Sequence, residues 1–379
     1  MMTPRVRTIA VGCLTALAVG TLAACASSGS GGSAVQWTTG SGPLMTPDPA
    51  TLARQQAHFD LQAHRGGMGL TTEETPLAFA RALELGVTTL ELDTQVSKDL
   101  QVIVWHDHRI GADTCRDTGP LTPGDPQYPY VGKYVVDLTL AQVRTLDCGY
   151  RQVPGFPQQQ VVHGVHPALL REVFAVVTAH HATDVTLNIE TRVEADQPSQ
   201  TAPRDVFVRR VWQEIHASGL EDQVTIESFD WAALRLLHRL APGIPLVALT
   251  TPAQLEVGTP GRSPWLGGLD VDDFGGDVVR AAASIPGVSA LSPIYGFPSS
   301  GAVGDPGFRF YVTQGMVREA HAHGLVVIPW TCDDPATMTA LIDMGVDGII
   351  TNYPDRLRAV MADHAMQLPT AYPATRPTT

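Results

Sequence analysis

The chain carries little positive charge and almost no lysine. Of its 379 residues, 25 are lysine or arginine and 38 are aspartate or glutamate, so the formal net charge is −13. Only two lysines occur, Lys98 and Lys133. Nucleic-acid binding draws its affinity from basic side chains on phosphates, so this balance speaks against a nucleic-acid partner. The surplus of carboxylates leaves room instead for a cation site.

The chain also lacks several motifs of common chemistries. It has no Gly-x-Ser-x-Gly nucleophile turn, no Cys-x-x-Cys pair for zinc, and no phosphate-binding loop with a lysine behind its glycines. Its hydrophobic share of 44% and charged share of 17% are sufficient for a full core. The chain is therefore neither disordered nor a polytopic membrane protein.

The first residues are typical of an export signal. Arg5 and Arg7 precede an apolar run at 9–24 that is too short and too rich in small residues for a comfortable membrane span. The run ends in Leu-Ala-Ala-Cys at 22–25, which resembles the lipobox of bacterial lipoproteins. The resemblance implies removal of 1–24, lipid on Cys25, and a Ser/Gly-rich tether at 25–50. An ordinary cleaved signal is the alternative.

A lipobox implies a location and a single membrane contact. The protein would be exported and held on the outer side of the cytoplasmic membrane or in the cell envelope, through its lipid alone. In that disulfide-permissive compartment Cys115 and Cys148 are a plausible pair, and two buried thiols are the alternative. Cys332 remains without a partner in this scheme, and Cys13 leaves with the signal.

Short β-rich runs alternate with helical patterns along most of the chain. Fewer than a dozen residues, with 97–100 among them, separate the second run from the third, and a parallel crossover needs a dozen or more, so that connection is a hairpin. The runs are 61–66, 88–93, 102–106, 185–190, 223–229, 245–250, 288–292, 325–330 and 348–351. Helical stretches are expected at 75–85, 167–181, 204–218, 231–240, 313–323, 336–344 and 355–366.

Setting the hairpin arm at 102–106 aside leaves eight β/α units. This count predicts an α/β fold, a TIM (β/α)8 barrel over 51–366, with the arm and an insert at 110–166 after the second barrel strand. An open doubly wound sheet is the main alternative, but it usually offers a Gly-rich nucleotide turn that is absent here. The Pro/Thr-rich tail at 367–379 has nothing to bury.

Two carboxylates on the second run indicate a cation site. Glu91 and Asp93 share one face of a strand, about 7 Å apart along the chain. Like charges side by side are costly unless a cation or a proton neutralises one of them. With Glu190 from another strand they provide three hard oxygen donors, which suit Mg²⁺ or Ca²⁺. A solvated rim in which arginines pair with these carboxylates is the alternative.

The first run ends in a histidine and an arginine. Neighbours on a continuing strand face opposite ways, so His64 and Arg65 can reach one substrate only if the strand ends there, which Gly66 and Gly67 permit. Arg65 would then offer a planar fork to a phosphate. On the returning arm His106 and His108 share a face, so the residues alone do not choose between them. The remaining histidines, such as His180, His181, His321 and His323, are expected at the surface.

These segments occur in an order that resembles the glycerophosphodiester phosphodiesterase family over roughly 60–360. The resemblance rests on His64-Arg65-Gly66, Glu73-Glu74-Thr75, Glu91-Leu92-Asp93, Val104-Trp105-His106-Asp107, Asn188-Ile189-Glu190, Ser228-Phe229-Asp230, Trp330-Thr331 and the segment Asp347-Gly348-Ile349-Ile350-Thr351-Asn352. The chain departs from the family pattern in three places. Glu74 replaces the usual Asn, Leu100 replaces a turn Gly, and Arg192 replaces a common Lys.

The resemblance implies an activity and a role for each motif. A glycerophosphodiester would be hydrolysed to sn-glycerol 3-phosphate and an alcohol, with a divalent cation on Glu91, Asp93 and Glu190. The family pattern selects His106 over His108 as the partner of His64 in acid–base catalysis, assigns phosphate binding to Arg65, and puts Trp330 in the substrate pocket. A phospholipase of the sphingomyelinase D type and a non-catalytic lipoprotein that binds phosphodiesters are the alternatives.

Overall fold

The structure is a computed structural model that describes residues 47–374. Eight parallel strands form one sheet in the order β10-β7-β6-β5-β4-β2-β1-β11. They are β1 (Asp60–Ala63), β2 (Thr89–Val96), β4 (Thr186–Thr191), β5 (Val224–Ser228), β6 (Leu246–Thr250), β7 (Val288–Pro293), β10 (Val326–Val327) and β11 (Gly348–Thr351). The two ends of this order meet, because the backbone N–H of Asp347 donates to Val327 O at 2.9 Å and that of Ile350 donates to Pro329 O at 3.0 Å. The predicted TIM barrel is confirmed.

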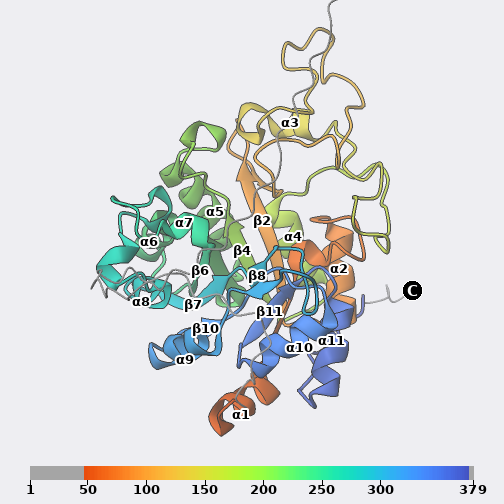
Figure 1. Ribbon diagram of the computed structural model, residues 1–379. Helices are drawn as coiled ribbons and strands as arrows, with labels where there is room; N and C mark the ends of the chain where they lie inside the picture. Colours follow the sequence, from red (N-terminus) through yellow and green to blue (C-terminus); the bar gives the residue numbers. More distant parts are fainter. Residues whose placement is uncertain (1–46, 375–379) are drawn as a thin grey trace, which may run out of the picture. The chain divides into compact units, whose positions relative to one another are not determined.

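Helices connect the strands and surround the barrel (Figure 1). Several begin with sequence signals that satisfy free backbone N–H groups. Thr75 caps α2 by accepting from Ala78 N, and Asp334 caps α10 by accepting from Thr337 N. The helices are α1 (Pro49–His58), α2 (Pro76–Leu85), α3 (Leu140–Val143), α4 (Leu170–Ala179), α5 (Arg204–Ser218), α6 (Trp231–Leu240), α7 (Pro252–Leu255), α8 (Val278–Ala283), α9 (Gln314–Ala322), α10 (Pro335–Asp343) and α11 (Pro354–Asp363).

The seventh barrel strand is shorter than the predicted run at 325–330. Only Val326–Val327 form the β10 ladder, and beyond it the Ser292 hydroxyl, in place of a backbone N–H, donates to Ile328 O at 2.6 Å. The chain nevertheless continues beside β7, where Ile328 N donates to Leu291 O and Trp330 N donates to Pro293 O. A small hairpin of β8 (Gly296–Phe297) and β9 (Arg309–Phe310) follows β7.

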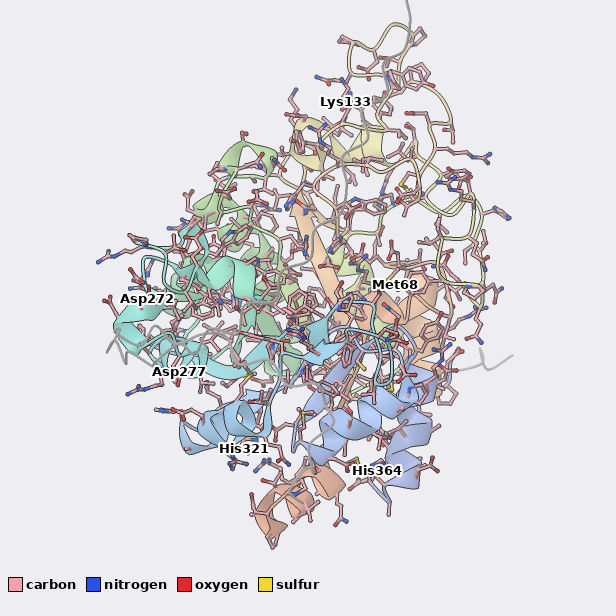
Figure 2. The ribbon with its side chains drawn as sticks, in the orientation of Figure 1. Met68, Lys133, Asp272, Asp277, His321 and His364 are labelled. Carbon is pink, nitrogen blue, oxygen red and sulfur yellow. A yellow bond between two sulfur atoms is a disulfide. The ribbon has the colours of Figure 1, made fainter. Side chains whose placement is uncertain are left out.

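The predicted arm is β3 (Val102–Val104), which pairs antiparallel with the far end of β2. Beyond it the insert has its own buried cluster, which includes Ile110, Tyr130 and Leu138, and a disulfide joins Cys115 to Cys148. Figure 2 labels Lys133 in the insert and Met68 in the loop after β1. The Gln159 side chain donates to Met68 O at 2.8 Å, so the end of the insert is tied to the barrel.

The barrel interior has two different halves. Polar side chains line one half, on β1, β2, β4 and β5, and apolar side chains line the other, on β6, β7, β11 and the extension of β10. We call these the polar half and the apolar half. The polar half consists of Gln62, Glu91, Asp93, Asn188, Glu190 and Glu227, and the apolar half of Val247, Leu249, Ala290, Ile328 and Ile350.

The described residues correct the last two positions of the predicted tether and contradict the expectation that the tail has nothing to bury. Residues from Pro49 form helix α1 rather than the end of a tether, and the Gln55 amide donates to Ile342 O and Val346 O. The tail does pack, because Tyr372 lies against the core and its N–H donates to Leu83 O. Residues 1–46, with the signal, Cys25 and most of the tether, and residues 375–379 lie outside the described part.

Two of the histidines expected at the surface, His180 and His321, are half-buried instead. His321, labelled in Figure 2, lies on α9 with its Nε2 2.8 Å from an Asp347 carboxylate oxygen. Arg54 of α1 binds the other oxygen of Asp347 at 2.7 Å. This cluster joins α1 to the barrel. Among residues 47–374, no helix is long and apolar enough to cross a membrane.

Candidate active site

A cavity of about 260 Å³ opens among the carboxyl ends of the barrel strands. This is the end at which TIM-barrel enzymes carry their active sites. Its lining brings together nearly all the residues that the sequence singled out, namely His64, Arg65, Glu91, Asp93, His106, Glu190 and Trp330. Arg192, Glu227, Phe229, Leu249, Thr331 and Ile350 complete it.

Strand β1 ends at Ala63, and the chain turns at once, which brings His64 and Arg65 to the same cavity. Arg65 has φ +52°, a left-handed conformation that non-glycine residues rarely adopt. Gly66 follows with φ +78°, and an added Cβ there would lie 2.9 Å from the Ala78 side chain. The sharp turn therefore requires glycine at this position.

The Arg65 guanidinium lies between two acidic groups. Its Nη1 donates to Glu73 at 3.0 Å, and its Nε lies 3.1 Å from an Asp93 oxygen. The backbone N–H of Arg65 donates to Glu91 at 2.9 Å. These contacts fix the fork at the cavity wall, where it can meet a phosphate.

The carboxylates meet because their strands are neighbours in register. Asp93 of β2 is paired with Glu190 of β4, which in turn is paired with Glu227 of β5. His64, Glu91 and Asp93 each offer one ligand atom, and these atoms lie within 4.8 Å of one another. Glu190 faces the same cavity, with its carboxylate on Arg192 at 3.1 and 3.2 Å.

The antiparallel arm brings His106 back to the cavity. Its Nδ1 lies 2.6 Å from an Asp107 carboxylate oxygen. Its backbone N–H donates to one oxygen of Glu74 at 2.9 Å, and the other Glu74 oxygen accepts from Asp93 N at 3.2 Å. Glu74, at the position where the family usually has Asn, thus ties the arm to the strand that carries the acidic pair.

His108 is not among the residues that line the cavity. Its Nε2 lies 3.3 Å from Glu194, and the Gln95 amide donates to its Nδ1 at 3.1 Å. Although His106 and His108 share a face on an ideal strand, β3 ends at Val104. The period-two rule therefore does not hold for the residues beyond it.

Sequence reasoning did not assign roles to two charged residues of the site, Arg192 and Glu227. Arg192 gives the cavity a second guanidinium, and Glu227 accepts from the Asn188 amide at 2.7 Å. Strand register could have found Glu227, because it lies beside Glu190 on the neighbouring strand β5.

Apolar side chains form the opposite wall of the cavity. The rings of Phe229 and Trp330 meet edge to face with centroids 5.4 Å apart. The Trp330 indole N–H donates to Ser292 O at 2.9 Å, which holds the ring in place. Leu249 and Ile350 extend this wall into the apolar half of the barrel. A substrate in the cavity therefore contacts charged groups on one side and carbon on the other.

Burial shifts the proton equilibria of the whole site. It raises the pKa of Glu190 to about 8, and the pKa of Glu91 lies well above its usual range because of burial and the neighbouring Asp93. Burial and the adjacent Arg65 charge lower the pKa of His64 to about 3. Burial and Arg192 lower the pKa of His106 to about 4. Both imidazoles are therefore neutral near pH 7 and able to accept a proton.

The fold and the site together define a TIM-barrel enzyme whose cavity combines two histidines and two arginines with buried carboxyl groups. The model of the glycerophosphoryl diester phosphodiesterase family matches residues 64–356, well over half of the chain. The chain belongs to this family and is a phosphoric diester hydrolase.

Relatives and solved structures agree with this membership. The chain is 28% identical over 302 residues to a glycerophosphodiester phosphodiesterase of Bacillus subtilis, covering 79% of this chain and 85% of the relative. A solved structure from Silicibacter pomeroyi has a TM-score of 0.68 and 26% identity, covering 84% of this chain and 99% of that one. An Oleispira antarctica phosphodiesterase solved with sn-glycerol 3-phosphate shares the fold, with a TM-score of 0.55, 17% identity, and coverage of 81% and 100%.

Proposed function

We propose that the enzyme hydrolyses glycerophosphodiesters to sn-glycerol 3-phosphate and a small alcohol, by two-histidine catalysis that depends on a divalent cation. The observation that carries this proposal is the convergence of His64, His106 and Arg65 with buried carboxylates in one cavity. The B. subtilis relative bears the name of this activity, and the O. antarctica phosphodiesterase was solved with the expected product.

The donor set fits a hard cation. Four carboxyl groups face two guanidinium groups in the cavity, so the fully ionised site would hold more negative charge than its arginines neutralise. Oxygen donors of this kind suit Mg²⁺ or Ca²⁺. We assign the cation to Glu91, Asp93 and Glu190, which keeps the His64 imidazole free for proton transfer. When bound, the cation would polarise oxygens of the substrate and offset negative charge.

The contacts of the two histidines indicate opposite proton roles. His64 Nδ1 lies 2.6 Å from the amide oxygen of Asn352, which is neutral, whereas His106 Nδ1 lies 2.6 Å from a carboxylate oxygen of Asp107. A carboxylate stabilises an imidazolium more than an amide does, because it adds charge attraction. We therefore assign His64 as the initial proton acceptor and His106 as the group that is protonated in the substrate complex and donates.

The reaction then proceeds in two displacements. His64 Nε2 takes the proton from the glycerol 2-hydroxyl, whose oxygen bonds to phosphorus while the bond from phosphorus to the leaving alcohol breaks. His106 gives its proton to that alcohol, which leaves a cyclic glycerophosphate. His106 next takes a proton from water, whose oxygen opens the ring, and His64 returns its proton to the 2-oxygen. Arg65 and Arg192 would hold the phosphoryl oxygens throughout.

The cavity favours a small alcohol over an acyl chain as the leaving part. Its volume is about 260 Å³. Residues 47–374 include several large apolar side chains that are exposed to solvent, but none of these lines the cavity. A lysophospholipid or sphingolipid substrate would need an apolar entrance for its chain. This argument disfavours the sphingomyelinase D alternative.

Release of glycerol 3-phosphate from glycerophosphocholine, glycerophosphoethanolamine and glycerophosphoglycerol tests this function. We expect turnover of at least one diester, loss of turnover in excess chelator, and recovery with Mg²⁺ or Ca²⁺. Calorimetric titration of the metal should give weaker binding to Glu190→Gln than to His64→Ala. Full turnover in chelator, or weakened metal binding by His64→Ala alone, would contradict the assignment.

We also propose that the enzyme is exported and anchored by lipid on Cys25, which lies outside the described residues. The proposal rests on the apolar run and the Leu-Ala-Ala-Cys sequence at 22–25. Cys25→Ser should move the protein from the membrane fraction to the soluble fraction or leave it unprocessed. Mass spectrometry of the mature protein should find lipid on Cys25, and an unmodified N-terminus at another residue would refute the anchor.

A further inference from the structure

The partner of His64 is a residue type that the chain otherwise hardly uses. The sequence contains two asparagines, Asn188 and Asn352, and both make hydrogen bonds to groups of the site. Asn352 follows β11 and is 7% exposed. Its Oδ1 lies 2.6 Å from His64 Nδ1. An amide oxygen can only accept, so Nδ1 must carry the proton and Nε2 keeps its lone pair.

Asp333 fixes the orientation of the Asn352 amide. Asn352 Nδ2 donates to Asp333 Oδ2 at 2.7 Å. A carboxylate can only accept, so a flipped amide would face it with an oxygen and lose this bond. Asp333 is itself held, because its other oxygen accepts from the backbone N–H of Asn352 at 2.9 Å and from the Thr351 hydroxyl at 3.1 Å.

We infer that Asp333 and Asn352 are positioning residues that set the tautomer and the ring orientation of His64. Neither residue lines the cavity, so they act through His64 and not on the substrate. The inference deepens the proposed function, because it explains how His64 presents an unprotonated Nε2. The free Nε2 lies 3.9 Å from Glu91, on the side where the reacting groups meet.

The ring orientation has a second support in the backbone. The Gly69 N–H donates to Asn352 O at 3.0 Å, and a Cβ on Gly69 would lie 2.8 Å from that oxygen. The loop after His64 is therefore fixed to the same residue that binds the imidazole. This backbone bond thus links the two chain segments that carry the His64–Asn352 contact.

The decisive experiment is nitrogen-15 NMR of the imidazoles in the full chain labelled at histidine. The wild type should show His64 with its proton on Nδ1. Asn352→Ala should shift His64 toward the Nε2-protonated form. The His106 signal serves as the internal control, because its Nδ1 partner is Asp107 and should not change.

Kinetics of the same variants separate positioning from binding. Asn352→Ala should lower kcat by about 10–100-fold with KM within about threefold, the range seen when a group that orients a reacting residue is removed. Asp333→Asn, which preserves volume, should lower kcat and give a mixed His64 tautomer. Combining Asp333→Asn with Asn352→Asp should restore the Nδ1-protonated tautomer of His64, because the new amide can donate to the new carboxylate, which in turn accepts from Nδ1.

The outcomes distinguish this inference from the proposed function. An unchanged His64 tautomer in Asn352→Ala, or a rise in KM at constant kcat, would overturn the positioning role. If Asn352→Ala does not fold, the tautomer in Asp333→Asn decides instead, and an unchanged signal there would overturn it equally. If the wild type hydrolyses no glycerophosphodiester, the proposed function fails while the tautomer still tests the contact.

Discussion

The polar and apolar halves of the barrel interior are both buried, but burial is favourable for the side chains of one half and costly for those of the other. Val247, Ala290, Ile328 and Ile350 are 2–6% exposed and pack against one another, so burial of carbon stabilises them. Glu91, Asp93 and Glu227 are 1–2% exposed, but they are charged when ionised and lie close together. Burial there is costly, and it is balanced only by hydrogen bonds, arginines, protons or a cation.

This difference indicates how stability and activity are divided. Strands β6, β7 and β11 face the interior with apolar side chains in ordinary packing, while β1, β2, β4 and β5 carry groups that the folded state accommodates at a cost. Burial raises the pKa values of Glu190 and Glu227, which shows that their ionised forms are unfavourable in the folded state. Substitutions in the polar half should therefore affect turnover more than folding, and substitutions in the apolar half should do the reverse.

The largest effect should follow removal of the proton-transfer groups. His64→Ala and His106→Ala should each lower kcat by about 10²–10⁴-fold with a modest change in KM. Because the two histidines act as a unit, the loss of kcat in the double variant should be much smaller than the product of the two single losses. His108→Ala is the matched control, and steady-state kinetics should find a loss below about tenfold, roughly 1 kcal/mol. If His108→Ala lost turnover while His106→Ala kept it, His108 and not His106 would be the catalytic histidine.

The polar half should also give the metal-free protein an unusual pH dependence. Glu190 titrates near 4.5 when unfolded and near 8 in the folded protein, where burial raises its pKa. The folded state then holds an extra proton between these values, so the contribution of Glu190 to stability is greatest below about pH 4.5 and falls as pH rises toward 8. Mg²⁺ or Ca²⁺ must displace such protons, so it should raise Tm more at pH 8 than at pH 5.5.

Thermal unfolding with and without chelator measures this dependence. The pH effect on Tm should amount to a few degrees for a chain of this size. Glu190→Gln is the control, because it removes the titrating group while keeping the volume. It should flatten the pH dependence and reduce the metal-induced shift. Equal metal shifts at both pH values would contradict the raised pKa of Glu190.

The smallest effect should come from the boundary between the halves. Trp330 contacts Phe229 and lies on the apolar wall, so it should contribute contact area to bound substrate rather than proton transfer. Trp330→Phe should raise KM by about threefold to tenfold, roughly 0.7–1.4 kcal/mol, with little change in kcat. Initial-rate measurements decide, and a kcat loss above about tenfold would mean that the indole positions reacting groups.

The sequence predicted the elements that depend on periodicity and short motifs. Eight alternating units gave the barrel, and the short link at 97–100 gave the arm. Contacts between distant segments left no periodic signal. The attachment of Tyr372 to Leu83 and the ion pair of Arg54 with Asp347 are examples. The start of α1 was readable, since Asp48 caps it and Pro49 opens it.

The site was predictable to a similar degree. Motifs named His64 and Arg65, which follow the end of β1 at a turn, and Glu91 and Asp93, which share one face of β2. The roles of Glu74 and Asn352 were not predicted, since they depend on backbone and side-chain partners that only the folded chain brings near. A residue that positions another acts through geometry that no spacing rule encodes.

A paired measurement of turnover and stability tests the division between the halves most directly. Glu91→Gln should lose most metal-dependent turnover while the Tm of the metal-free protein stays constant or rises, because an unfavourable buried acid is removed. Ile328→Ala, which is not part of the cavity lining, should lose about 2–5 kcal/mol of stability and keep kcat within about threefold per folded molecule. Loss of stability without loss of turnover in Glu91→Gln, or loss of turnover without loss of stability in Ile328→Ala, would contradict the account.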